Sequence, residues 1–392
     1  MQSNVWLRSR AYDLFFLHAG LWTMLIVIPL AGNDVLKPFH FTLGVLFWIG
    51  HRLATAYLAF CQQAYQELLV EQRTRFVTVP LVFTVVVFVM LLIPESILPI
   101  PLLYRVLPLA VLDFAWEFYH FTMQHYGVVS VYRIRAQQDP GAVQEKRLEK
   151  IFCMTVFGGG IPAAVVYHSL VTLSANNADF IVPGWAIQTF RFLAIAFALG
   201  FTARMVIKEL SIANTSMPKI MYMIAVGVPV SLALILDSMA PALLVLAIQH
   251  WLVAVGISAH MASGTGPVRK APNAWYRFWG FVNRTPFRVL VVMCIFSAVL
   301  APVMEFSDVE RRLAVKTWRG MFSPTMTERS YVYWGEMYLD WFSGLGEHTV
   351  LMFFVAAGFS FGFVHYLMDR AIFRFSNAAT RRSSLPLLLG RG

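Results

Sequence analysis

Residues 113–125 read Asp113-Phe-Ala-Trp-Glu117-Phe-Tyr-His120-Phe-Thr-Met-Gln124-His125, inside a run that is otherwise as apolar as a membrane-spanning helix. At about 100° per residue, the side chains of Asp113, Glu117, His120 and Gln124 fall within about 60° of one another around a helix. Ionisable side chains in the middle of a bilayer cost about 2.5 kcal/mol or more each, and where they occur they are paired or functional. We therefore predict that this polar stripe is the functional centre of the protein.

The rest of the chain has the composition of a helical membrane protein. Of its 392 residues, 58% are hydrophobic and 13% are charged, about half the charged fraction of soluble domains. Apolar runs of about 20 residues recur, the length that crosses a bilayer as a helix, whereas a β-barrel would show shorter alternating segments. We predict an all-α polytopic integral membrane protein with about ten transmembrane helices. The predicted spans are 13–32, 41–62, 77–94, 102–130, 151–172, 185–204, 218–236, 242–262, 286–304 and 348–371.

The charge distribution predicts how the chain crosses the membrane. The net charge is +10, and the basic residues gather at both ends and in the connections after even-numbered spans, as the positive-inside rule requires of cytoplasmic segments. This pattern predicts both termini in the cytoplasm, a bacterial inner-membrane location, and no nucleic-acid partner. We expect one transmembrane domain over 1–371 and a basic cytoplasmic tail over 372–392 without ordered structure. The three cysteines have no CxxC spacing and predict neither a disulfide framework nor a thiolate zinc site.

Three connections carry specific predictions. Segment 131–150 is expected to continue the fourth helix and to break at Asp139-Pro140-Gly141. The outer segment 305–347 mixes aromatic and charged residues, which suits an extracytoplasmic interfacial helix or a lid. Segment 237–241 is so short that spans seven and eight should form a tight hairpin.

Histidines in other spans fall at depths close to the polar stripe. With a rise of about 1.5 Å per residue, His51, His120 and His250 lie within about one turn of the bilayer midplane. Imidazole and carboxylate groups together are the ligands of iron, manganese, zinc or copper. Glu117-x-x-His120 also matches the i, i+3 pairing by which di-iron helix bundles present two ligands.

These observations predict a non-haem metal centre, with one or two iron atoms, that oxidises or oxygenates a lipophilic substrate taken from the lipid bilayer. The predicted direct metal ligands are His51, Glu117, His120 and His250. Further ligands, or side chains that orient the imidazoles, are predicted to be His125, His260, His365 and Asp369. The predicted catalytic hydrogen-bond and charge partners are Asp113, Gln124 and Arg52, together with Glu117. No NAD or flavin motif is present, so electrons would come from an external donor or from the substrate.

Other interpretations of the same residues stay open. A proton-coupled transporter could use a relay of His, Asp and Glu side chains without metal, and a haem-binding electron-transfer subunit could use two facing histidines. Glu117 could neutralise Arg52 in a buried ion pair, and His365 with Asp369 could be an inner-edge pair. His18 lies close enough to the interface to be hydrated.

The placement of histidines on several spans is similar to that in bacterial carotene-cleaving dioxygenases, which hold iron with histidines from several helices. Fatty-acid desaturases also carry many histidines toward the cytoplasm, but their HxxxH and HxxHH boxes are absent from this sequence. No motif is shared along the chain, so neither resemblance assigns a role to any residue.

Overall fold

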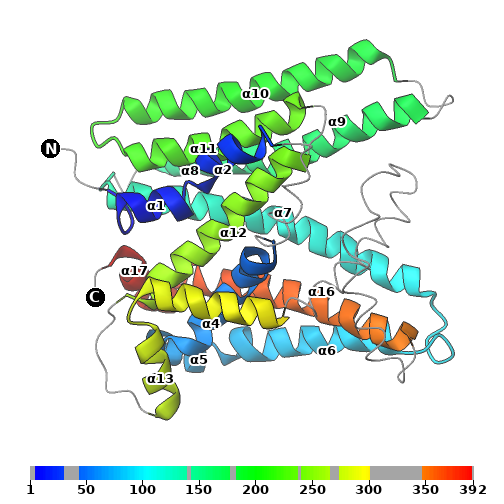
Figure 1. Cartoon of the computed structure of the whole chain (residues 1–392), viewed down its shortest axis with the longest axis vertical. Coiled ribbons are helices and arrows are strands. Elements are labelled where there is room, and N and C mark those ends of the chain that lie inside the picture. Colours follow the sequence, from blue (N-terminus) through cyan, green and yellow to red (C-terminus); the bar gives the residue numbers. More distant parts are fainter. Residues whose placement is uncertain are drawn as a thin grey trace. The chain divides into compact units, whose positions relative to one another are not determined.

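The computed structural model describes residues 5–30, 44–138, 143–176, 182–236, 240–264, 273–300 and 347–390. All regular structure in these ranges is helical (Figure 1), which confirms the predicted all-α fold class. The chain forms two compact units, described separately below. Unit 1 comprises Met1–Trp48, Phe118–Gly264 and Leu387–Gly392, and unit 2 comprises Ile49–Glu117 and Thr265–Pro386.

The helices of the first half of the chain are α1 (Arg10–Phe16), α2 (Ala19–Val27), α4 (Ile49–Cys61), α5 (Gln66–Glu71), α6 (Val79–Leu92), α7 (Leu102–Arg135), α8 (Val143–Phe152) and α9 (Gly158–Asn176). The later helices are α10 (Gly184–Leu210), α11 (Met217–Ile235), α12 (Ala240–Ala262), α13 (Ala274–Val282), a helix over Pro286–Leu300, α16 (Glu347–Ile372) and α17 (Ala378–Leu389). Short π-helical turns, η1 (Gly44–Trp48), η3 (Thr74–Thr78) and η4 (Cys153–Phe157), precede α4, α6 and α9, and a 3₁₀ turn, η2 (Gln63–Tyr65), precedes α5.

Six described segments are long and apolar enough to cross a membrane. They are Thr74–Leu92, Val143–Thr172, Gly184–Leu210, Met217–Ile235, Pro241–Ala262 and Met352–Ile372, and a seventh would be the bent pair Ala274–Val282 and Pro286–Leu300. Two of them, α6 and α10, expose apolar side chains along their length, such as Leu81 and Phe192. Continuous apolar surface of this kind is rare on proteins in water but ordinary on helices that face lipid. The exposed surfaces of α6 and α10 are therefore those expected of membrane-spanning helices.

In unit 1, α9, α10 and α11 lie side by side (Figure 1). Helix α12 follows α11 after a short connection and packs against both α11 and α2, which confirms the predicted hairpin of spans seven and eight. The contact of α2 with α11 needs Gly20, because a Cβ there would overlap the carbonyl oxygen of Ala225. Pro229 supplies no N–H to that carbonyl, so its oxygen stays exposed to the neighbouring helix.

The predicted first span, 13–32, is not one continuous helix. Helix α1 ends at Phe16 and α2 begins at Ala19, with His18 as its N-cap residue. The His18 ring nitrogens lie 2.9 Å from the carbonyl oxygen of Asp13 and 2.8 Å from that of Pro218. The His18 side chain is fully buried, so the expectation that it is hydrated is wrong. The imidazole holds this interruption closed against α11.

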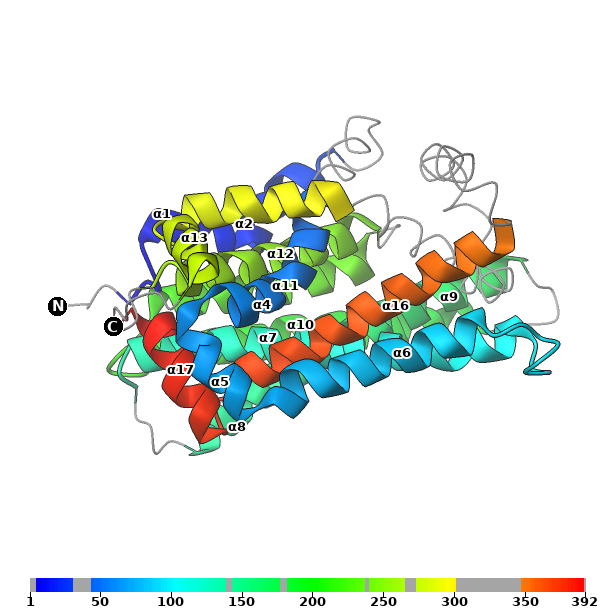
Figure 2. The same ribbon diagram turned by 90° about the horizontal axis from the view of Figure 1, so that it is seen from below.

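In unit 2, α6 and α16 run side by side, and α4 packs against α16 (Figure 2). The contact between α6 and α16 is an apolar core of aromatic and aliphatic side chains, among them Val87, Leu91, Phe359 and Phe363. Trp116 of α7 joins this core, stacked on the Tyr366 ring with centroids 6.0 Å apart. Large side chains from three helices therefore fix the positions of α16 and of the first part of α7.

Helix α7 contains the whole of the predicted polar stripe and ends at Arg135, before the break predicted at residues 139–141. Its 34 residues correspond to a length of about 51 Å, more than a bilayer core of about 30 Å. The unit boundary falls between Glu117 and Phe118 in this helix.

The C-terminal tail corrects an expectation. We predicted no ordered structure after residue 372, whereas Ala378–Leu389 form helix α17. The buried Ser384 hydroxyl donates to the Ile372 carbonyl at 2.9 Å and accepts from the Tyr65 hydroxyl at 3.0 Å. The basic residues of the tail suggested solvent exposure, although one face of α17 is apolar and hydrogen-bonded to the rest of the chain. The predicted outer segment 305–347 lies outside the described residues, apart from Glu347 at the start of α16.

Candidate intramembrane polar sites

Unit 2 brings together two histidines and one aspartate that the sequence singled out. The rings of His51 on α4 and His365 on α16 meet edge to face, with centroids 4.8 Å apart. His365 and Asp369 lie four residues apart on one face of α16, with Nδ1 and Oδ1 separated by 3.6 Å. All three side chains are at least nine-tenths buried. The separation of 3.6 Å is longer than a hydrogen bond, and is close to the distance between two ligands that share one metal ion at about 2.1 Å from each.

A charged pair of the same unit lies beside Gly362, which shares one face of α16 with His365 and Asp369 at about 100° per residue. The Asp113 carboxylate and the Arg52 guanidinium lie 3.4 and 3.6 Å from the point that a Cβ on Gly362 would occupy. Both side chains are buried. Because Gly362 has no side chain, the Arg52 guanidinium of α4 and the Asp113 carboxylate of α7 can both approach α16 closely.

Unit 1 holds a second histidine group, on α7 and α12. The rings of His120 and His250 are perpendicular with centroids 5.1 Å apart, and the His125 and His250 centroids are 6.0 Å apart. Phe121 stacks on His250 at 3.7 Å, and the Gln124 amide donates to the His250 carbonyl at 3.0 Å. In unit 1, His120 and Gln124 of the predicted stripe thus face α12.

His125 differs from its neighbours in how its two nitrogens are used. Its Nδ1 lies 2.5 Å from the Tyr222 hydroxyl, whereas its Nε2 is buried without a hydrogen-bond partner among the described residues. A hydroxyl or carboxylate that holds one nitrogen while the other is directed to a metal is the usual arrangement of a ligating histidine. The sequence placed His125 about 120° from the stripe, and Tyr222 is what explains that displacement.

His260, another predicted ligand, has protein partners on both ring nitrogens. Its Nε2 lies 3.0 Å from the Leu388 carbonyl oxygen, and Arg8 approaches its Nδ1 at 3.5 Å. These contacts give His260 a role in holding the ends of the chain in unit 1. They do not place it with the other histidines of that unit.

Three buried polar side chains of unit 1, on Asp13, Tyr132 and Tyr222, were not predicted from the sequence. The Asp13 carboxylate is fully buried and accepts from the Leu7 N–H at 2.6 Å and from the Tyr132 hydroxyl at 2.9 Å. The Tyr132 and Tyr222 rings have centroids 6.3 Å apart, so buried hydroxyls extend from Asp13 toward His125. An aspartate at the start of an apolar run was the only signal of this series.

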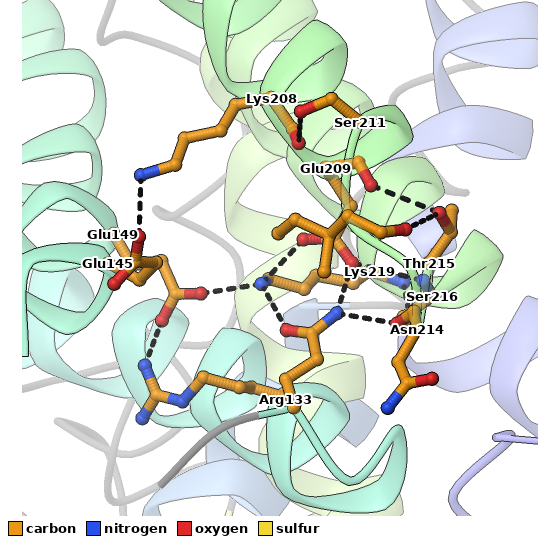
Figure 3. A network of polar contacts seen from close by, with 12 residues as sticks. Arg133, Glu145, Glu149, Lys208, Glu209, Ser211, Asn214, Thr215, Ser216 and Lys219 are labelled. Atoms are coloured by element: carbon orange, nitrogen blue, oxygen red, sulfur yellow. Dashed lines mark hydrogen bonds and ion pairs between the residues drawn. The ribbon is translucent and has the colours of Figure 1, made fainter. Parts of the chain in front are cut away.

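Figure 3 shows a separate network of charges that joins four helices of unit 1. The buried Lys219 ammonium lies 2.5 Å from Glu149, 2.7 Å from Glu209 and 3.0 Å from the Gln138 amide oxygen. Arg133 pairs with the same Glu149. The residues line a cavity of about 320 Å³. Because each buried charge has an opposite charge as its partner, the network acts as a junction of α7, α8, α10 and α11.

Comparison of the chain with models of known protein families, with curated proteins and with solved structures finds no match. Any functional conclusion therefore depends on the buried polar groups and on the apolar helices that carry them.

Proposed function

We propose that the chain is an integral-membrane, metal-dependent oxidoreductase, with iron as its metal, that oxidises or oxygenates a lipophilic substrate. The observation that carries this proposal is the buried pair of His365 and Asp369 in unit 2, with the His51 ring packed against His365. Two histidines and one carboxylate are the ligand set of non-haem iron(II) oxygenases, and this set leaves coordination positions open. When bound, the metal would activate O₂ or act as a Lewis acid.

The spacing of the two rings in this group is compatible with one shared metal. With metal–nitrogen bonds of about 2 Å, two imidazoles at adjacent positions of one ion have centroids roughly 5 Å apart, close to the 4.8 Å between His51 and His365. Two axial haem ligands would be farther apart, at roughly 6 Å by the same bond lengths. The spacing is shorter than that of two axial haem ligands, and it is also the spacing of an edge-to-face ring pair without a metal.

The residues around the group would control charge and access. The Arg52 and Asp113 side chains beside Gly362 would hold a polar substrate end or balance the charge of the metal. In unit 1, His120, His125 and His250 form a second candidate ligand set. The prediction that His51, Glu117, His120 and His250 bind the same metal stays a prediction, because these residues belong to both units.

The membrane setting is part of the proposal. Ten spans, an outer interfacial segment over 305–347, and both termini on the cytoplasmic side of a bacterial inner membrane are what the apolar runs and the basic connections favour. A lipophilic substrate would reach buried ligands laterally from the lipid. Electrons would come from an external donor or from the substrate itself.

Metal analysis of purified variants tests the proposal. We expect one or two irons per chain in the wild type, lost from His365→Ala and Asp369→Asn. His168→Gln is the matched control, because His168 contacts the Ala233 carbonyl at 2.8 Å and belongs to neither group. Loss of metal from His125→Ala instead would move the site to unit 1. A wild-type protein without stoichiometric metal would refute the proposal.

A second candidate function is a proton-coupled carrier. It is favoured by the buried series from Asp13 through Tyr132 and Tyr222 to His125, whose hydroxyls and imidazole are groups that can pass protons. This function predicts proton movement in metal-free proteoliposomes that is abolished in Tyr222→Phe. The oxidoreductase predicts no such movement, and a Soret band would instead identify haem.

A further inference from the structure

Helix α13 of unit 2 has one buried face and one aromatic and basic face. Trp279 and Val282 are buried, whereas Phe278 and Phe281 are 56% and 52% exposed. At about 100° per residue, Arg277, Phe281 and Phe278 fall at about 0°, 40° and 100° around the helix, next to the buried pair at about 140° and 200°. The outward face is therefore an aromatic surface with an arginine at its edge, which is neither a core face nor an ordinary hydrated face.

The orientation of α13 is fixed by hydrogen bonds at its C-terminal end. The helix meets the apolar helix Pro286–Leu300 at 109° (Figure 1). Asn283, in the bend between them, donates to the Cys61 carbonyl at 2.9 Å and accepts from the Tyr57 hydroxyl at 2.6 Å. If Pro286–Leu300 crosses the bilayer, the nearly right-angled α13 lies in the plane of the membrane.

Arginines gather at the exposed face of α13. Arg284 and Arg288 lie over the Phe281 ring, with Cζ 5.6 and 4.2 Å from its centroid, and Arg288 also donates to the Phe281 carbonyl at 3.1 Å. Arg277 is exposed on the same side. Two guanidinium groups stacked on one phenyl ring give a surface that is apolar at the ring edge and positively charged around it. Interfacial helices that contact lipid headgroups combine these two properties.

We propose that α13 is a surface helix that binds anionic phospholipid headgroups at the cytoplasmic leaflet. Phe278 and Phe281 would enter the boundary between headgroups and acyl chains, while Arg277, Arg284 and Arg288 would bind the lipid phosphates. The competing arrangement, a re-entrant segment inside the bilayer, would place Arg277 in hydrocarbon, where an arginine is strongly disfavoured. The proposal does not depend on the metal centre.

The depth of α13 is tested by cysteine labelling of the full chain in nanodiscs. A Cβ at Gly280 has no neighbour within 4 Å, so Gly280→Cys is a benign probe on the outward side. The native Cys61 and Cys153 are buried, and the half-buried Cys294 is replaced by serine in every labelled variant. A membrane-impermeant maleimide should label Gly280→Cys rapidly and Phe281→Cys at least tenfold more slowly. Protection of both positions would show a re-entrant helix and overturn the proposal, as would rapid labelling of both.

Lipid recognition is tested by the anionic phospholipid that co-purifies with the chain from nanodiscs of phosphatidylcholine and phosphatidylglycerol. The variant Arg277→Gln/Arg284→Gln should retain anionic lipid with about fivefold lower affinity for each arginine removed. The matched control is Arg374→Gln/Arg381→Gln, which removes two exposed arginines elsewhere in unit 2. Equal retention by both variants would overturn the proposal. So would unchanged lipid retention with loss of binding to an acidic electron-donor protein, which would make α13 a protein-docking surface.

Discussion

At the scale of single residues, Asp13 is a buried group whose removal should destabilise unit 1. Its carboxylate accepts from two backbone N–H groups, of Leu7 and Arg8, and from the Tyr132 hydroxyl. Asp13→Ala would leave these donors buried without an acceptor, at about 1–3 kcal/mol for each donor that finds no water. We expect Asp13→Asn, which keeps one oxygen acceptor, to lose less.

The fraction of monodisperse protein that survives a heating series in detergent measures this difference. Tyr132→Phe is the informative companion, because it removes one donor and leaves the backbone contacts of Asp13 intact. The expected order of stability is wild type, then Tyr132→Phe, then Asp13→Asn, then Asp13→Ala. Equal midpoints for Asp13→Ala and wild type would show that the carboxylate contributes nothing to the fold.

Single residues also show what the sequence could and could not predict about the site. The stripe on α7 follows from helical periodicity alone, because spacings of three and four residues decide which side chains share a face. The partner of His125 does not follow, since Tyr222 has the same appearance in the sequence as any aromatic residue of an apolar span. A hydroxyl becomes part of a site only when another helix brings it there, and no local pattern encodes that contact.

At the scale of elements, the Lys219 network shows how four helix ends are joined. Lys219 and its partners Glu149 and Glu209 are each at most 3% exposed. Removing one member of such a buried pair leaves an uncompensated charge, which costs about 3–5 kcal/mol. We therefore expect Lys219→Met to destabilise unit 1 strongly.

The same helices offer a matched control for this prediction. Lys208 pairs with Glu145 at 3.3 Å, but both side chains are about one-third exposed, and solvent-exposed pairs of this kind contribute little to stability. Lys208→Met should therefore shift the thermal midpoint little. Similar shifts for the two lysine variants would mean that burial does not set the strength of these pairs.

Elements also explain where the predicted boundaries failed. The sequence shows 13–32 as one apolar run, yet the backbone breaks at His18, whose buried imidazole lies between the carbonyl oxygens of Asp13 and Pro218. The C-terminal tail shows the opposite error, because a helix is present where no ordered structure was predicted. Its arginines suggested a solvated segment, but Leu387 and Leu388 are buried, so spacing on a helix outweighed the overall charge.

At the scale of the whole molecule, the number of spans decides the side on which each terminus lies. Six described segments meet the length and hydropathy of a span, whereas the apolar runs predict ten. The four additional predicted spans each contain a feature that lowers their apolar length. These are the His18 interruption in 13–32, the His51-Arg52 pair in 41–62, the polar stripe in 102–130, and the end of the described helix at Leu300 in 286–304.

Sidedness separates these counts, because an even number of spans returns the chain to its starting side. With ten spans and a cytoplasmic N-terminus, Glu95 between α6 and α7 lies outside, and Ser211 after α10 lies inside. Both are exposed, so each can be changed to cysteine with little effect on packing. An impermeant maleimide added to intact cells should label Glu95→Cys alone, and only permeabilised cells should show Ser211→Cys. Labelling of both from outside would require an even number of crossings between them, which contradicts the three that we predict. The predicted topology would then be wrong, and with it the depth in the bilayer at which a lipophilic substrate would reach the buried histidines and carboxylates.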